Sequence, residues 1–339
     1  MGERMERNKA QRIKRKRRQR KILLGLIVFL FFVVVSTVVY GYLTLSKIKT
    51  KDFTENKEEL GIQQEVEAKI TDDKKKIKNI VLLGIDQREN DGGRSDAVVI
   101  ATVDPVHNKL KLTSLMRDSY VNIPGRGYDK LTHAYAFGKE QLSIKTINQN
   151  FGLNITDYVK VNFEEMEKVI DAVGGLDIEI RSDELDNMNE HIRDLSKRAG
   201  VTAKEISSPG MKHLNGLQAL AYTRIRYTNG GDAERTERHR KVLTMLFDKI
   251  TSAGPGKLPG MVNKLLPLVE TSLSSGEILD LASTSLTIGN KKVEQQRFPL
   301  DQFSKGDKIN GVYQLTFDEE PTRDQIFKYL FDDIKPSGK

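Results

Sequence analysis

The chain has 339 residues and a formal net charge of +8, but the positive charge is concentrated at one end. Residues 1–21 carry eleven Lys or Arg and two Glu, a charge of +9, so the rest of the chain sums to about −1. This distribution argues against a nucleic-acid-binding domain, and the absence of cysteine excludes disulfides and Cys-ligated metal centres.

An uncharged apolar run at residues 22–45 follows the basic segment directly. It has the 20 or so apolar positions that a helix needs to cross a bilayer, and it is too long for a signal-peptide core. Because dense Lys and Arg stay on the cytoplasmic side, we expect residues 1–21 to form a cytoplasmic tail. The sequence therefore predicts a single-pass cell-membrane protein of type II with an uncleaved anchor at 22–45 and its bulk outside the cytoplasm.

Residues 46–76 are rich in charged and polar side chains and poor in apolar ones. This composition is typical of a solvated segment that cannot form its own core. We expect a stalk that separates the membrane anchor from the globular part.

Alternating strand and helix patterns begin after the stalk. Short β-branched or Leu-rich runs bounded by Gly, Asp, Pro and Asn predict strands at 79–85, 97–103, 109–116, 158–161, 176–180, 293–298 and 311–315. Helical spacing of apolar residues predicts helices at 140–151, 163–173, 214–222, 234–252, 261–271, 276–287 and 320–334. We expect one extracytoplasmic α/β domain with a central mixed β-sheet and helices on both faces. Residues 77–252 would form its core, and 253–339 would complete the same domain.

Two acidic and two basic side chains stand where the first two predicted strands meet. Asp86 and Arg88 leave the first strand, and Arg94 and Asp96 enter the second. If the two strands pair as a hairpin, both carboxylates reach one edge of the sheet and can share a hard divalent cation such as Mg²⁺. The alternative is a loop of solvated charges.

Two further basic clusters follow. Arg117 comes directly after the third strand, either at the same end of the sheet or in a surface turn. Arg224 and Arg226 face one way if the chain is extended there. Arg235, Arg238 and His239 share one face of a helix, where they either bind an anion or pair with nearby glutamates.

Considered together, the clusters favour phosphate chemistry. The planar guanidinium of Arg binds phosphate oxygens in pairs, and Arg, carboxylate and a divalent metal together suit phosphoryl transfer. The five histidines lack metal-ligand spacing, and the sequence contains neither a GxSxG nor a P-loop motif.

Several of these segments resemble the LytR-CpsA-Psr family of cell-envelope proteins. The similar motifs are LLGID near 82–86, RSDAVV at 94–99, LMRDSYV at 115–121, KLTHAYAFG at 130–138, VGGLDI at 173–178 and HLNGLQALAYTRIR with DAERTERHRKVL within 213–243. The likeness covers about residues 78–252 in unbroken order. One position departs from the family pattern, because His239 stands where relatives commonly carry Gln.

The resemblance implies a phosphotransferase that moves an anionic glycopolymer, of wall teichoic acid or capsule type, from undecaprenyl diphosphate to peptidoglycan. By motif position, Asp86 and Asp96 would hold Mg²⁺ or Mn²⁺ on the diphosphate, and either could act as the base, with Arg117 in the catalytic group. The implied phosphate-binding residues are Arg88, Arg94, Arg117, Arg224, Arg226, Arg235, Arg238 and His239. An apolar tunnel for the polyprenyl chain is also implied, and the implied partners are the lipid-linked glycopolymer, peptidoglycan and the membrane, but no nucleic acid.

Two other functions use the same residues. A non-catalytic polyprenyl-phosphate or wall-binding regulatory protein would use the arginines without turnover. A lipid pyrophosphatase would use the same site with water as the acceptor. The paired carboxylates favour an enzyme, because a simple anion binder gains nothing from Asp86 and Asp96 unless a metal lies between them and the phosphates.

Overall fold

The computed structural model describes one compact unit within Ile48–Lys339. The residues it describes are 49–50, 53–54, 56–86, 92–226, 231–252, 260–261, 264–288 and 292–336. The predicted tail at 1–21 and the predicted anchor at 22–45 lie outside these residues. Within the described ranges, no helix has both the length and the apolar character needed to span a bilayer.

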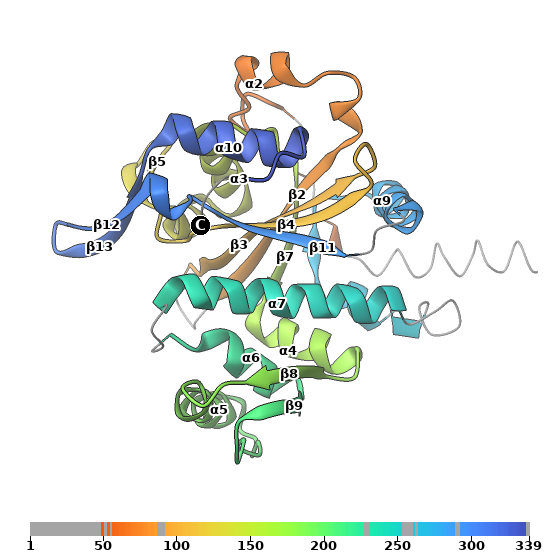
Figure 1. The fold of residues 1–339 in the computed structure, drawn as a ribbon, viewed down its shortest axis with the longest axis vertical. Helices are drawn as coiled ribbons and strands as arrows, with labels where there is room; N and C mark the ends of the chain where they lie inside the picture. The colour runs from red at the N-terminus through yellow and green to blue at the C-terminus, as the bar shows by residue number, and fades with distance from the viewer. Residues whose placement is uncertain are drawn as a thin grey trace, which may run out of the picture. The chain divides into compact units, whose positions relative to one another are not determined.

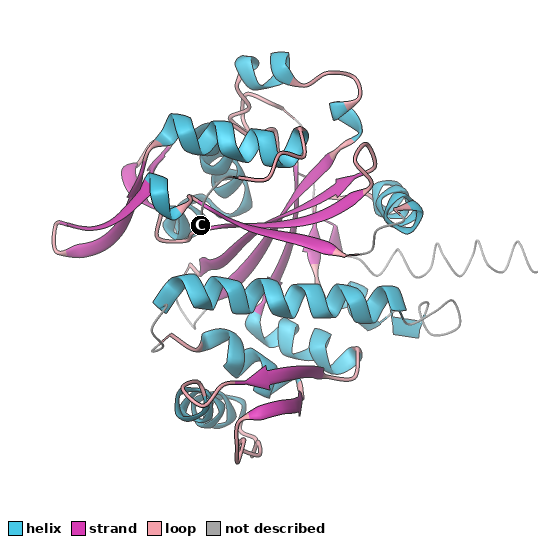
Figure 2. Cartoon of the chain, viewed as in Figure 1, coloured by secondary structure: helices cyan, strands magenta, loops and turns pink. Residues whose placement is uncertain are grey.

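A seven-stranded mixed sheet forms the centre of the unit (Figure 2). The strand order is β1 (Lys49–Thr50), β10 (Glu270–Thr271), β7 (Asp157–Asn162), β2 (Lys78–Asp86), β3 (Arg94–Asp104), β4 (Lys109–Leu115) and β11 (Val293–Phe298). β2, β3 and β4 pair antiparallel, whereas β7 runs parallel to β2 and β11 runs parallel to β4. The predicted α/β fold with a central mixed sheet is confirmed.

Both faces of the sheet are covered, which explains the almost uninterrupted apolar runs of its central strands. Successive side chains of a strand point to opposite faces. Thus Val81, Leu83 and Ile85 enter the larger core, which is formed with α3 (Leu131–Phe151) and α10 (Glu319–Phe331). Leu82 instead belongs to a smaller cluster on the opposite face with residues of α7 (Gly231–Ser252).

The remaining elements surround this sheet (Figure 1). On the side of α7 lie α4 (Phe163–Ala172), α5 (Leu185–Ala199), α6 (Gly216–Arg224) and the hairpin of β8 (Leu176–Ile180) with β9 (Gly210–Leu214). These elements share a second apolar core of their own. Two more hairpins are β5 (Tyr120–Ile123) with β6 (Gly127–Lys130) and β12 (Ser304–Ile309) with β13 (Val312–Phe317). The other short elements are α2 (Gln64–Lys69), η1 (Lys74–Lys76), η2 (Leu266–Leu268), α9 (Ser275–Thr287) and η3 (Asp301–Phe303).

The described part of the predicted stalk differs from a solvated spacer. Leu60 is fully buried in the larger core, and Phe53, Ile62 and Ile70 pack against that core. These apolar side chains are few and widely spaced, so composition alone gave no sign of a buried face. Most of the interval 53–76 is therefore part of the folded unit.

The helix predicted at 261–271 is also wrong in its second half. Leu266–Leu268 forms a single 3₁₀ turn that contains Pro267, and Glu270–Thr271 pairs with β7 as a strand. The hydroxyl of Thr271 donates to the Tyr158 carbonyl, which fixes this pairing. Proline and the available edge of β7 outweigh the helical spacing of the leucines.

We predict that Leu60→Ala lowers the free energy of unfolding by about 2–5 kcal/mol, because it leaves a cavity in the larger core. Urea unfolding of the full chain followed by circular dichroism measures the change. Leu279→Ala, at a side chain that is 57% exposed on α9, is the control and should change stability by less than about 0.5 kcal/mol. Equal effects of the two substitutions would contradict the burial of the 53–76 interval.

Candidate active site

An irregularity in the β2–β3 pairing gives the site its two acidic residues. Gly84 pairs with Ala97 and Ile85 pairs with Ser95, so Asp96 is the extra residue of a β-bulge. A bulge re-aims side chains and is common beside active sites. Asp86, at the end of β2, and Asp96 both line a pocket of about 200 Å³.

Asp96 is held by arginines from three other segments. Arg117, which follows β4, donates from Nη1 to Asp96 Oδ1 at 2.8 Å. Arg235 on α7 donates to the Asp96 carbonyl oxygen at 2.9 Å, and its Nη1 lies 3.8 Å from Oδ2. Arg226 Nη2 lies 3.5 Å from the same Oδ2. The structure therefore brings together residues that lie up to 139 positions apart in the sequence.

Charge controls the ionisation of this carboxyl group. Burial by itself would raise the pKa of Asp96, but Arg117, Arg235 and Arg226 together hold that pKa below its ordinary value. Asp96 is therefore an anion at neutral pH, and it neutralises part of the positive charge in the pocket.

Arg224 and Arg226 reach the pocket from the end of α6. Asn215 begins this helix with a capping box that includes Gln218. At Gly216 the helix approaches α4 so closely that a Cβ would lie 2.1 Å from the Glu167 carbonyl oxygen, so only glycine fits there. Arg224 Nη2 lies 3.4 Å from Asp86 Oδ1, and the chain is extended beyond it, which turns Arg226 to the same pocket.

The far wall of the pocket comes from α5, a helix that the sequence interpretation missed. His191, Asp194 and Arg198 line the pocket, and Arg198 Nη2 lies 2.8 Å from Asp194 Oδ2. Burial, and secondarily the charge of Arg224, lowers the pKa of His191, so its ring is neutral at pH 7. Spacing of the buried Met188 and Ile192 at i, i+4 was the available signal, but charged residues around them hid it.

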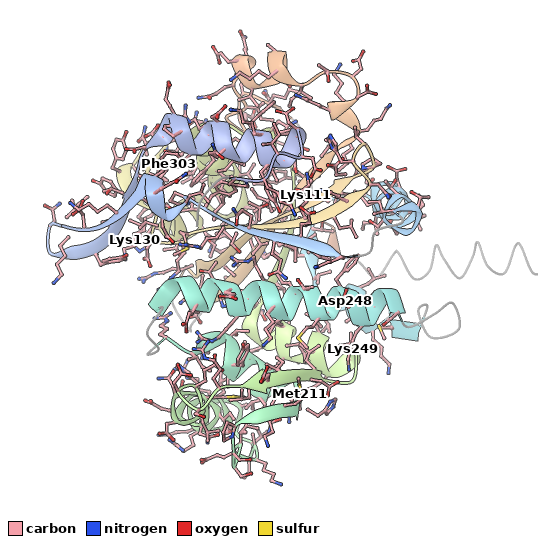
Figure 3. All side chains as sticks on the ribbon, viewed as in Figure 1. Lys111, Lys130, Met211, Asp248, Lys249 and Phe303 are labelled. Atoms are coloured by element: carbon pink, nitrogen blue, oxygen red, sulfur yellow. The ribbon has the colours of Figure 1, made fainter. Side chains whose placement is uncertain are left out.

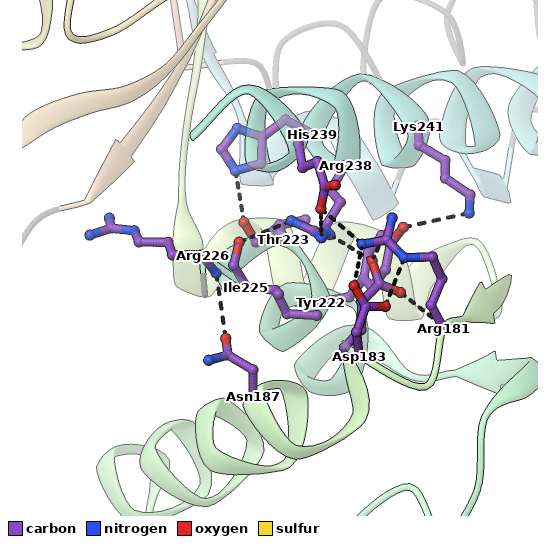
Figure 4. A network of polar contacts seen from close by, with 12 residues as sticks. Arg181, Asp183, Asn187, Tyr222, Thr223, Ile225, Arg226, Arg238, His239 and Lys241 are labelled. Carbon is purple, nitrogen blue, oxygen red and sulfur yellow. Dashed lines mark hydrogen bonds and ion pairs between the residues drawn. The ribbon is translucent and has the colours of Figure 1, made fainter. Parts of the chain in front are cut away.

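His239 has a different task from the phosphate binding that was predicted for it. Its Nε2 lies 3.1 Å from the carbonyl oxygen of Thr223 (Figure 4). Burial, reinforced by Arg235, lowers the pKa of His239 to about 3, so the ring is neutral. Because a carbonyl oxygen only accepts, Nε2 carries the single ring hydrogen, and that hydrogen is already used. His239 therefore joins α7 to the end of α6.

Arg238 is also turned away from the pocket. Its guanidinium donates to Glu184 at 2.9 Å, to Glu234 at 2.8 Å and to the Ile225 carbonyl oxygen at 3.1 Å. Figure 4 shows Arg238 in a cluster with Arg181 and Asp183, apart from the His239 ring. Helical spacing could not separate Arg238 from Arg235, because the buried carboxylate of Glu184 decides the direction. The structure therefore places Arg238 outside the lining of the pocket to which the sequence assigned it.

Of the two remaining predicted arginines, the structure describes only Arg94. Arg94 is exposed on β3, opposite Asp86 in the strand register, and is not part of the pocket lining. Arg88 lies outside the described residues.

The donor set fits a divalent cation that is shared with substrate. In the described part of the chain, no three carboxylate or imidazole side chains converge as a metal site. Asp86 and Asp96 nevertheless line one pocket. Arg226 and Arg235 lie 3.5 and 3.8 Å from Asp96 Oδ2, which are longer distances than those of ordinary hydrogen bonds. Mg²⁺ is commonly bound by one or two carboxylates together with substrate phosphates and water.

An apolar cavity of about 280 Å³ adjoins the polar pocket. It lies between the sheet and α4, α6 and α7, and Thr223 and His239 line both hollows. Gly84 and Ala97 leave space on the sheet side, where a Cβ on Gly84 would lie 3.0 Å from the Ala97 Cβ. The other lining residues include Leu82, Val99, Val159, Val161, Met166, Leu220, Val242, Leu243, Leu246, Phe247 and Ile250. This volume is nearly twice that of an engineered apolar cavity of roughly 150 Å³ that stays dry and binds benzene. The cavity therefore suits a hydrocarbon segment.

This fold and site define an α/β protein with an arginine-lined polar pocket beside an apolar cavity. The chain belongs to the LytR_cpsA_psr family, whose sequence profile matches residues 35–329, and the predicted resemblance is confirmed. A relative from Enterococcus faecalis strain V583, named polyisoprenyl-teichoic acid–peptidoglycan teichoic acid transferase TagU, is 30% identical over 322 residues. The alignment covers 90% of this chain and 94% of the relative.

Solved structures agree with this assignment. A structure described as TagT bound to LI-WTA has a TM-score of 0.63 and 26% identity, over 84% of this chain and 98% of that one. A second, of YwtF (TagT) with bound octaprenyl pyrophosphate lipid, has a TM-score of 0.60 with the same identity and coverage. These relatives confirm the prediction of an enzyme of the transferase class.

We predict that substitution of Arg238 lowers stability, whereas substitution of Arg226 weakens ligand binding. Arg238→Ala leaves Glu184 buried without its main partner and should lower the free energy of unfolding by about 3 kcal/mol or more. Arg226 is half-exposed, so Arg226→Ala should change stability by less than about 1 kcal/mol but weaken the binding of inorganic diphosphate. Urea unfolding and calorimetric titration measure the two quantities. Unchanged diphosphate affinity in Arg226→Ala would contradict its place in the pocket.

We also predict that His239 makes the free energy of unfolding decrease in acid. Its pKa is about 3 in the folded chain, against an ordinary value of 6.5 for an imidazole in water, so the unfolded chain binds an extra proton between these values. The stability contribution is complete above about pH 6.5 and is lost progressively as the pH falls towards 3. His239→Gln should therefore flatten the decrease in unfolding free energy between pH 6.5 and 4.5.

The control for this measurement is Met211→Ala, at an exposed side chain on β9 that has no titratable group. It should leave the pH dependence as in the wild type. If the His239 and Met211 variants respond alike, His239 is not held neutral in the folded chain.

Proposed function

We propose that the chain transfers an anionic glycopolymer of the wall teichoic acid type from undecaprenyl diphosphate to peptidoglycan, forming a phosphodiester. The proposal rests on one observation, which is that the polar pocket and the apolar cavity share part of their lining. An arginine-lined pocket and an apolar cavity meet at Thr223 and His239, which suits a ligand with a charged head and a hydrocarbon tail. The TagU relative's name and the octaprenyl pyrophosphate in the TagT structure support the same ligand class.

The chemistry follows from the residues around the pocket. A hydroxyl of the acceptor attacks the phosphorus that bears the polymer, and the bond from that phosphorus to the bridging diphosphate oxygen breaks. Polyprenyl monophosphate leaves with the electron pair. Arg224, Arg226 and Arg235 stabilise the charge that develops on the phosphate oxygens, because they are already oriented before the substrate binds.

We assign different tasks to the two carboxylates. Asp96 holds three arginines in place, and its lowered pKa makes it a weak base. Arg224 Nη2 lies 3.4 Å from Asp86 Oδ1, and Asp86 accepts the proton of the attacking hydroxyl. Mg²⁺ or Mn²⁺, bound by these two residues and the diphosphate, would supply additional neutralisation of charge.

Location at the outer face of the cell membrane is part of the proposal. The +9 segment at 1–21 followed by the uncharged run at 22–45 supports an orientation with the site outside the cytoplasm. In that orientation the enzyme and its lipid-linked donor occupy the same thin layer, which raises their effective concentration.

We predict that the full chain in detergent, given lipid-linked teichoic acid, peptidoglycan oligomers and Mg²⁺, produces the coupled polymer. Asp86→Asn should lower the rate about 100-fold or more with the melting temperature nearly unchanged. Arg117→Ala should lower the rate as much and also lower the melting temperature, because it removes the 2.8 Å partner of the buried Asp96 carboxylate. Chelation of the metal should stop the reaction, and added Mg²⁺ or Mn²⁺ should restore it. Product analysis by mass spectrometry gives the rate.

Arg193→Ala is the control, because Arg193 lies on α5 but pairs with Glu205 outside the pocket. Tight binding of the lipid without any coupled product would contradict the transferase proposal and favour a non-catalytic regulatory binding protein. Free phosphorylated polymer, formed equally with and without acceptor, would indicate a pyrophosphatase.

A further inference from the structure

Three tyrosines lie on the two hairpins next to the site, of which Tyr128 and Tyr313 are exposed and Tyr120 is partly buried. On the β5–β6 hairpin, Tyr120 pairs with Lys130 and Asn122 pairs with Tyr128. Val121 and Ile123 are buried, so the tyrosines and Lys130 occupy the outer face. The rings of Tyr120 and Tyr128 lie 5.3 Å apart, and Tyr128 is 56% exposed.

Tyr313 extends this row onto the β12–β13 hairpin. Lys130 Nζ lies 5.9 Å from the centre of the Tyr313 ring, and Tyr313 is 49% exposed. A Cβ on Gly306 would lie 2.8 Å from the Tyr313 ring, so the glycine lets the ring lie against its own hairpin. We call Tyr120, Tyr128, Lys130 and Tyr313 the aromatic row.

The aromatic row is connected to the pocket by a continuous set of contacts. Lys130 donates to Asp118 at 2.6 Å, and Asp118 lies 3.6 Å from Arg117 Nε, whose guanidinium binds Asp96. The Asp118 carbonyl oxygen accepts from the Leu315 amide at 2.9 Å, which docks β13 on the same turn. Figure 3 labels Lys130 where the two hairpins meet, and Figure 1 shows both hairpins at one end of the sheet.

The chemistry of this surface fits a polysaccharide. A sugar ring presents C–H groups on its faces, which pack on aromatic rings, and hydroxyls at its edges, which accept from an ammonium group or a tyrosine hydroxyl. A lipid surface fits less well, because Lys130 and Asp118 form an ion pair in the middle of the row. Exposed aromatic patches with polar neighbours are typical of binding sites.

We propose that the aromatic row holds the glycan strand of the peptidoglycan acceptor and leads its hydroxyl to the pocket at Asp96. This inference rests on the proposed function. It gives the C-terminal β12–β13 hairpin a place in acceptor recognition that no sequence motif indicated.

The test uses the full chain in detergent and glycan strands from which an amidase has removed the stem peptides. Wild-type chain should bind these strands, and Tyr128→Ala and Tyr313→Ala should each weaken binding about 2- to 10-fold. Tyr313→Phe should keep most of the affinity. In the transfer assay the same alanine variants should raise the acceptor KM and leave kcat and the affinity for inorganic diphosphate unchanged.

Two controls separate the aromatic row from general surface effects. Val312→Ala changes the neighbouring exposed side chain on β13, and Met211→Ala changes an exposed side chain on β9, far from the row in Figure 3. Both should bind strands as the wild type does, and all variants should melt at the wild-type temperature.

The outcomes distinguish the two proposals. Wild-type affinity in both tyrosine variants, or loss of binding once the stem peptides are removed, overturns the aromatic row as a glycan site. A wild-type chain that binds strands through the row but makes no coupled product supports the row and overturns the proposed transferase reaction.

Discussion

The ion-pair cluster around Asp96 determines how the functional end of the molecule is assembled. A carboxylate that is 9% exposed would be costly to keep ionised without partners, and three guanidinium groups would repel one another without the carboxylate. The Asp96 carboxylate and the three guanidinium groups therefore stabilise one another. Because Arg117 follows β4, Arg226 follows α6 and Arg235 belongs to α7, the cluster also fixes these three segments around the bulge of β3.

The same cluster bears on the anion binding that we propose for the pocket. Asp96 compensates part of the arginine charge, and a diphosphate would add negative charge beside Arg226 and Arg224. Arg226 and Arg224 lie 3.5 and 3.4 Å from their carboxylate partners, so a substrate phosphate can replace these weak contacts at little expense.

Much of this arrangement could be predicted from the sequence, because the central strands are β-branched runs buried on both faces and the motifs stand at their ends. The strands at 79–85, 97–103 and 109–116 and the meeting of Asp86 with Asp96 belong to this part. Local patterns could not give the roles of Arg238 and His239, since a buried glutamate and a backbone carbonyl from other elements decide them. Local sequence patterns also failed to predict α5. They placed the start of α3 at residue 140 and so missed its first nine residues, because a kink at Gly138–Lys139 interrupts the helical spacing.

The strand order of the sheet has a consequence for how the chain acquires its structure during synthesis. β4 is covered on its outer edge by β11, and the larger core contains Phe298, Tyr329 and Leu330 from the last part of the chain. A polypeptide that has emerged only as far as residue 252 has an open strand edge and an incomplete core. Folding therefore depends on contacts between distant parts of the sequence, which slows it and leaves apolar surface exposed until the final residues arrive. Such a domain would benefit from a folding helper that covers this apolar surface until synthesis is complete.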